Sequence, residues 1–144
     1  MKHLAFAITA TLLFLNISAL AQQNNASTND PSLISATVRD YIEGYYAGDA
    51  VRMERTLHPH YLKHIIHGAI PMRETTGPQM IGNVRAEGIP NLEASQRTEQ
   101  ITVLDISGEI ASAKLVTPGW TDYLTLSKSD GAWKILSVVQ RIDN

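Results

Sequence analysis

Asp122 is the residue whose position points most directly to chemistry. It lies in a run with the alternating pattern of a β-strand, so it shares a face with Trp120, Leu124 and Leu126. An ionised carboxylate among apolar side chains is costly unless it is paired or hydrogen-bonded. Burial would raise the pKa of Asp122 and leave it able to donate a hydrogen bond or a proton. The alternative is a structural acid held by a neighbouring Tyr, Trp or backbone donor.

His64 is the second candidate for a catalytic role. Residues 61–67 alternate as a strand does, which puts His64 on one face with Leu62 and Ile66. An inward histidine on such a face is a candidate general base. The alternative is a core or rim histidine without a catalytic role.

Four histidines, His58, His60, His64 and His67, raise the question of a metal site. On a helix, the last three would share a face and could bind zinc, but on a strand His67 faces the other side, and Pro59 also disfavours the helix. No cysteine or well-placed carboxylate completes a ligand set, so we expect no metal. The sequence also has no phosphate-binding glycine loop, no nucleophile elbow and no cysteine nucleophile, and we expect no cofactor.

The elements that would position these residues begin with helices. Asp30 and Pro31 start a helix with an apolar face that runs to Gly48, and Tyr41 and Tyr45 lie one turn apart on it. These two phenols either face the same cavity as hydrogen-bond donors or belong to the core. A second, short helix is capped by Asp49 and ends at the pre-proline residue His58.

Strands dominate the rest of the chain. After the strand at residues 61–67, a third helix starts around residues 75–78 and ends near Gly88. Strands are then expected at residues 95–106 and 110–117, followed by a terminal hairpin whose turn is Asp130-Gly131. Helices first and antiparallel strands afterwards indicate an α+β fold.

The N-terminus resembles a cleaved secretory signal. Lys2 and His3 precede an apolar run too short to span a bilayer, and Ala19-Leu20-Ala21 matches a signal-peptidase site. We therefore expect a signal peptide at residues 1–21, a flexible polar leader at 22–30 and one domain at 31–144. The chain has no cysteine for a disulfide or a lipid anchor, which predicts an exported protein free in the periplasm or secreted. Its formal net charge of −2 argues against a nucleic-acid partner.

The order of elements and the C-terminal motifs resemble the nuclear-transport-factor-2-like superfamily. Within it, the closest likeness is to the small proteins called putative lumazine-binding or SnoaL-like, over about residues 32–142. The carriers are Tyr41-Ile42-Glu43-Gly44-Tyr45 with Gly48-Asp49, Leu57-His58-Pro59, Gly119-Trp120-Thr121-Asp122-Tyr123-Leu124 and Asp130-Gly131-Ala132-Trp133-Lys134-Ile135.

This resemblance implies a cone: a curved antiparallel sheet wrapped by N-terminal helices, open at one end to a small apolar molecule and often paired into dimers through the sheet. In related enzymes, the strand after the second helix carries a catalytic carboxylate or histidine, near His64 here. The superfamily contains isomerases, dehydratases, cyclases and plain binding domains, so the fold leaves the activity open.

Three functions remain open at this point. The first is binding of a small, partly apolar molecule, with Tyr41, Tyr45, Trp120 and Leu124 as walls and Asp122, alone or with His64, as the polar groups that orient it. The second is a cofactor-free isomerase or dehydratase in which His64 takes a proton and Asp122 or a Tyr stabilises charge. The third is a dimeric interaction or structural domain. Only the second requires His64 and Asp122 to meet in one cavity.

Overall fold

The computed structural model describes residues 29–87 and 93–143. The expected signal peptide at 1–21 and most of the expected leader at 22–30 lie outside the described residues. Residues Ser32–Asn144 form one compact unit, whose architecture follows. No helix in the described ranges has both the length and the apolar character needed to cross a membrane.

Helix α2, Asp30–Ala47, ends directly before Gly48, the residue at which the sequence predicts that it stops. Gly48 has a φ of 65°, in the left-handed region that glycine adopts without strain. Its N–H donates to the Tyr45 carbonyl, and the Asp49 N–H donates to the Gly44 carbonyl, which together form a Schellman motif. The chain therefore turns sharply between α2 and the next helix.

Helix α3, Ala50–Thr56, starts at the predicted cap, because the Asp49 side chain accepts a hydrogen bond of 2.9 Å from the Arg52 N–H. The prediction that α3 continues to His58 is wrong. The helix ends at Thr56, since Leu57 already pairs with Ile135 in the C-terminal strand of the chain.

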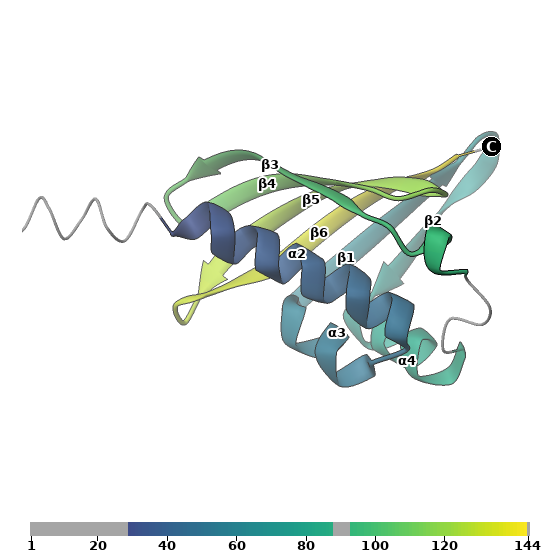
Figure 1. The fold of residues 1–144 in the computed structure, drawn as a ribbon, viewed down its shortest axis with the longest axis horizontal. Helices are drawn as coiled ribbons and strands as arrows, with labels where there is room; N and C mark the ends of the chain where they lie inside the picture. Colours follow the sequence, from purple (N-terminus) through teal and green to yellow (C-terminus); the bar gives the residue numbers. More distant parts are fainter. Residues whose placement is uncertain (1–28, 88–92, 144) are drawn as a thin grey trace, which may run out of the picture. The chain divides into compact units, whose positions relative to one another are not determined.

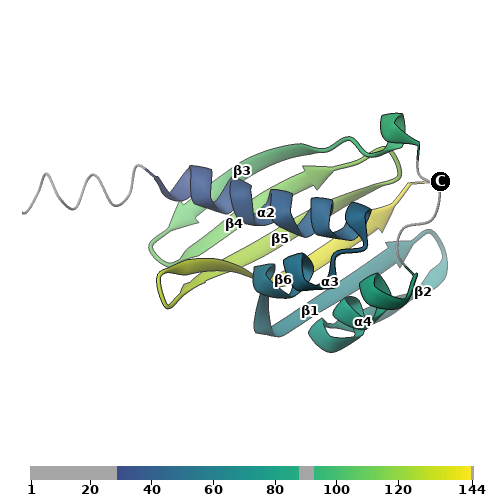
Figure 2. The same ribbon diagram turned by 60° about the horizontal axis from the view of Figure 1, so that its bottom comes forward.

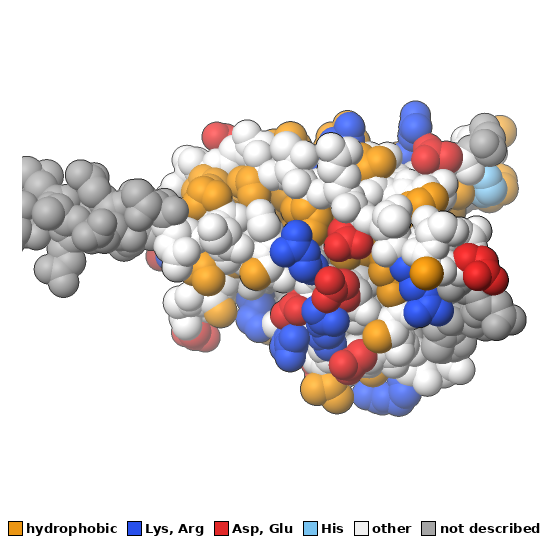
Figure 3. All heavy atoms as spheres, in the orientation of Figure 1, with side chains coloured by type: hydrophobic (Ala, Val, Ile, Leu, Met, Phe, Trp, Pro, Cys, Tyr) orange, Lys and Arg blue, Asp and Glu red, His pale blue; other side chains and the backbone are white. Residues whose placement is uncertain are grey.

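Charged side chains hold α2 against α3. The Asp40 carboxylate accepts hydrogen bonds of 2.9 Å from both Arg52 and Arg55, and Arg52 also pairs with Glu43. Figure 3 shows this mixed acidic and basic cluster on the molecular surface, over the two helices. The corner between the helices is thus closed by ion pairs on its outer side.

The sheet has six strands in the order β2-β1-β6-β5-β4-β3. Neighbouring strands are antiparallel except β1 and β6, which are parallel. The strands are β1 Leu57–His67, β2 Ile70–Thr76, β3 Gln100–Ser107, β4 Ile110–Val116, β5 Trp120–Ser129 and β6 Ala132–Ile142. Helices α2, α3 and α4, Gly77–Glu87, lie on one face of this sheet (Figures 1 and 2). The described unit is therefore α+β, as predicted.

The sheet differs from the prediction in three respects. Strand β2 was not expected, and the β1–β6 pair is parallel in a sheet expected to be antiparallel throughout. The strand expected from Ser95 begins only at Gln100. Residues Ala94–Gln96 form a short 3-10 helix instead. A capping box stabilises its N-terminus, and in it the side-chain oxygen of Gln96 accepts a hydrogen bond from the Glu93 N–H.

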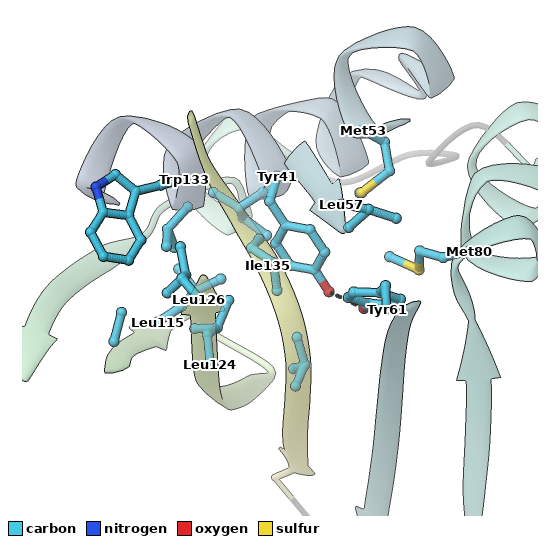
Figure 4. Close-up of a cluster of buried hydrophobic side chains, with 14 of the residues drawn as sticks. Tyr41, Met53, Leu57, Tyr61, Met80, Leu115, Leu124, Leu126, Trp133 and Ile135 are labelled. Carbon is cyan, nitrogen blue, oxygen red and sulfur yellow. Dashed lines mark hydrogen bonds between the residues drawn. The ribbon is translucent and has the colours of Figure 1, made fainter. Parts of the chain in front are cut away.

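The core lies between α2 and the inner face of the sheet (Figure 4). Its fully buried apolar side chains come from both layers and are Ile34, Val38, Met53, Ala113, Leu115, Leu126, Ile135 and Val138. The terminal hairpin turns at Asp130-Gly131 as predicted, both with positive φ. On β5 the predicted alternation is correct, since Asp122, Leu124 and Leu126 are all buried.

A β-bulge in β6 decides which of its residues face the helices. The register against β5 shifts between Thr125 and Leu126 of β5, so one extra residue is inserted in β6. Because side chains alternate along a strand, this insertion lets Ile135 before it and Val138 and Gln140 after it all face inward. The bulge thus brings Gln140 to the same face as Asp122.

Candidate functional site

A cavity of about 370 Å³ opens between helices α2 and α4 and the inner face of the sheet. This volume lies in the usual range of about 300–1,000 Å³ for ligand pockets. Its apolar walls are Ile42, Tyr45, Ile65, Met80, Trp120 and Ile142. Arg73 and Asn83, both exposed, also line it and mark the side that meets solvent. The cavity therefore combines apolar walls with a few polar groups.

Asp122 lies in this cavity, fully buried at 0% exposure. Burial raises the pKa of its carboxyl, and the positive charge of Lys63 opposes that rise. Gln140 and Trp120 also oppose the rise in this pKa, yet neither carboxyl oxygen has a partner in hydrogen-bond geometry in the part of the chain that the structure describes. A buried carboxyl without hydrogen bonds is costly, so the desolvation of Asp122 is offset only in part, by the nearby charge of Lys63.

Lys63 faces Asp122 across the cavity and was missed by the sequence analysis. Its Nζ lies 3.9 Å from Asp122 Oδ2 and donates a hydrogen bond of 3.2 Å to the Tyr41 hydroxyl. The residue is only 6% exposed, and burial lowers the pKa of its ammonium group while Asp122 opposes this shift. The inward face of β1 is Tyr61, Lys63 and Ile65, one residue out of phase with the face we expected.

Two tyrosines extend the polar end of the cavity into the core. The hydroxyls of Tyr41 and Tyr61 lie 3.4 Å apart and point toward each other (Figure 4). Burial, with the nearby Tyr61 and Asp122, raises the pKa of Tyr41, which keeps its phenol protonated. Lys63, Asp122 and Tyr41 therefore form a connected group of one amine, one carboxyl and one phenol.

The aromatic wall is built from α2 and β5. The rings of Tyr45 and Trp120 meet edge to face with centroids 5.8 Å apart, an arrangement that aromatic pairs prefer. Both rings line the cavity, as the sequence analysis expected of them, and so does Tyr41. A flat apolar group would pack against this wall.

Two other expected site residues lie elsewhere. His64 does not line the cavity: its Nε2 is 3.1 Å from Glu74 Oε1 of the neighbouring strand β2. Of the two alternatives for His64, the inward orientation that a general base requires is not observed, because Lys63 takes the inward position on β1. Leu124 is 2% exposed and packs in the core, not against the cavity.

The histidine cluster does not form one site. The rings of His58 and His60 lie 5.5 Å apart, while His64 pairs with Glu74. Among the residues that the structure describes, no group of three or more His, Asp or Glu side chains has metal-binding proximity.

Comparisons with solved structures show the same fold in three bacterial proteins. A protein of unknown function from Silicibacter pomeroyi, described as NTF-2 like, has a TM-score of 0.68 at 17% identity, over 81% of this chain and 98% of that one. A second from Shewanella baltica, described as NTF2-like, has a TM-score of 0.61 at 18% identity, over 86% and 96%. A ketosteroid isomerase-like protein from Erwinia carotovora atroseptica has a TM-score of 0.59 at 11% identity, over 80% and 97%.

The sequence itself matches one family model. No curated protein sequence matches the chain. The family model described as "Putative lumazine-binding" matches residues 29–140. This range includes all of α2 as well as Lys63 and Asp122. The chain therefore belongs to this lumazine-binding-like family, within the nuclear-transport-factor-2-like fold.

Proposed function

We propose that this protein binds a small, partly apolar molecule in the cavity between α2, α4 and the sheet. The observation that carries the proposal is the carboxyl of Asp122, which is fully buried, lines the cavity and has no hydrogen-bond partner among the described residues. A ligand that donates a hydrogen bond would satisfy it. The description of the family as lumazine-binding supports a small-molecule ligand in general terms.

The lining of the cavity defines the ligand's shape and polarity. An aromatic or other flat apolar part packs against Tyr45 and Trp120, and a polar end reaches Asp122 and Lys63. At the solvent side, Arg73 has no ion-pair partner among the described residues, and it favours an outer end that is polar or acidic.

Blocking the entrance tests the proposal. Benzyl alcohol, which has an apolar ring and a hydroxyl donor, is a suitable probe, and its binding is measured by saturation-transfer difference NMR. We expect binding to be lost in Asn83→Trp, whose indole fills the solvent side of the cavity. The control is Arg85→Trp, on the same helix but not in the cavity lining. Equal binding by the two variants would contradict the proposal.

An enzymatic role is the second candidate. It is favoured by the pairing of an acid with a raised pKa and a lysine with a lowered pKa in one cavity, since groups shifted in this way by burial and a charged partner are characteristic of acid–base catalysis. The pair is Asp122 with Lys63, because His64 lies outside the cavity. The ketosteroid isomerase-like neighbour is compatible with such chemistry, but it is 11% identical and shares the fold alone.

Pairing of two copies through the outer sheet face is a separate proposal. Tyr123 and Val139 lie directly opposite each other on β5 and β6 and are 51% and 43% exposed. Light scattering coupled to size-exclusion chromatography tests it: a dimer that Tyr123→Lys converts to a monomer supports pairing, and a wild-type monomer contradicts it.

Export is the last part of the proposal. The charged start, the apolar run and Ala19-Leu20-Ala21 support cleavage after Ala21. N-terminal sequencing of the protein from the periplasm or medium of a bacterial host should begin at Gln22. Retention of Met1 in a cytoplasmic fraction would contradict export.

A further inference from the structure

We infer that Lys63 is a nucleophile that captures an aldehyde or ketone in the cavity as an imine. The inference rests on the proposed function, because it assigns a chemical class to the molecule that the cavity binds. Its basis is the placement of one primary amine among a carboxyl, a phenol and apolar walls.

The amine of Lys63 is held where a bound molecule can reach it. The side chain is 7% exposed and lines the cavity, and its Nζ is fixed by the Tyr41 hydroxyl at 3.2 Å. A lysine on the protein surface has no such fixed position. Here the amine faces the same space as the aromatic wall, so an apolar group packed on Trp120 can present a carbonyl carbon to Nζ.

Burial also favours the reactive form of the amine. Only the neutral amine attacks a carbonyl, and desolvation lowers the pKa of Lys63. Asp122 opposes this shift by its negative charge, but burial raises the pKa of Asp122 as well, which weakens that opposition. Desolvated lysines in apolar pockets are suited to imine formation for this reason.

The reaction balances with groups already in the cavity. The Lys63 nitrogen forms a bond to the carbonyl carbon, and transfer of a proton from nitrogen to oxygen gives a carbinolamine. The protonated carboxyl of Asp122 then donates a proton to the hydroxyl, the carbon–oxygen bond breaks and water leaves. The products are an iminium ion on Lys63 and a carboxylate on Asp122, which is 3.9 Å away and pairs with it. No oxidant or reductant is consumed.

Reductive trapping tests the inference directly. The protein is incubated with benzaldehyde and sodium cyanoborohydride at neutral pH, and the benzylated lysines are found by peptide mass mapping. The internal controls are Lys114, Lys128 and Lys134; the first two lie over the rings of Tyr123 and Trp133 and line no part of this cavity.

We expect labelling of Lys63 that saturates with benzaldehyde concentration and is several-fold faster than labelling of the three control lysines. Lys63→Arg, which keeps the positive charge, should lose this labelling, and Lys114→Arg should keep it. Labelling of Lys63 that is absent, or no faster than that of Lys114, would overturn the inference. The wild-type map decides the question even if Lys63→Arg does not fold.

A second readout separates this inference from the proposed function. Benzyl alcohol has the same ring but no carbonyl, so its binding depends on the cavity and not on an imine. Binding of benzyl alcohol without trapping of benzaldehyde at Lys63 would overturn the imine and leave the binding function standing. If benzyl alcohol also fails to bind, the proposed function falls, and the imine with it.

Discussion

Asp122 and Lys63 form a buried pair whose pKa values shift in opposite directions. Burial makes the folded protein bind the Asp122 proton more tightly than the unfolded chain does, so its contribution to the free energy of unfolding falls as the pH rises above 3.8. For Lys63 the unfolded chain binds the proton more tightly, so its contribution rises as the pH approaches 10.5. The other titratable groups facing the pair, Tyr41 and Tyr61, have raised pKa values and stay protonated below pH 10.

The pair should therefore produce a minimum in relative stability at intermediate pH. We expect the free energy of unfolding of the wild type, measured against that of Lys63→Met/Asp122→Asn, to fall above pH 4 and to recover toward pH 10. Each proton contributes a slope of at most about 1.4 kcal/mol per pH unit. Urea unfolding of both proteins across this range measures the difference. The contributions of titratable groups that both proteins share, such as Asp40, cancel in this difference. A difference independent of pH would contradict the opposite shifts.

Removing the carboxyl of Asp122 should weaken ligand binding more than removing a carboxyl that lies outside the cavity. We expect Asp122→Ala to weaken binding of benzyl alcohol roughly fivefold, because a typical hydrogen bond to a neutral group contributes about 1 kcal/mol. Calorimetric or NMR titration measures the affinity. Glu74→Ala is the matched control, since Glu74 pairs with His64 outside the cavity. Equal losses in the two variants would show that Asp122 makes no ligand contact.

Secondary-structure elements, more than single side chains, decide where these groups meet. The corner between α2 and α3 depends on close approach: a Cβ on Gly44 would lie 3.1 Å from the Met53 backbone nitrogen. At Gly82, in the middle of α4, the same position has no atom of another described segment within 4 Å. These two helical glycines therefore form a matched pair: a side chain at Gly44 would crowd the neighbouring helix, and a side chain at Gly82 would not.

Replacing each by alanine should have opposite effects on stability. Gly82→Ala should raise the free energy of unfolding by about 0.5–1 kcal/mol through helix propensity and a less flexible unfolded chain. Gly44→Ala should lower it, because the clash with the α3 backbone exceeds that gain. Urea unfolding measures both. A Gly44→Ala protein as stable as Gly82→Ala would show that the corner is not tightly packed.

The sequence predicts most of these elements, but it does not predict which face of β1 is buried. The period of two in residues 61–67 is visible, yet the face with Leu62, His64 and Ile66 is the more apolar one in the sequence, because the buried face carries Lys63. The parallel pairing with β6 and the coverage by α4 decide between the two faces, and both are long-range. On β5 the two faces differ strongly in polarity, so Asp122 could be placed correctly from the sequence alone. The bulge in β6 leaves no sequence signal that would have predicted Gln140 beside Asp122.

For the molecule as a whole, the fold does not determine the function. Structures with 11% to 18% identity share this architecture, so the helices and sheet say little about the ligand. The ligand depends instead on the side chains that line the cavity, above all Lys63 and Asp122 beside an aromatic wall. We therefore propose this cavity as the binding site.

Titration of the isotope-labelled protein with benzyl alcohol, followed by the indole N–H signals in a proton–nitrogen NMR spectrum, tests that claim most directly. The chain has two tryptophans: Trp120 lines the cavity, and Trp133 is 4% exposed in the core on another part of the sheet. The account predicts a saturable shift of the Trp120 signal while that of Trp133 stays in place. A Trp120 signal that does not move, or equal movement of both signals, would contradict it.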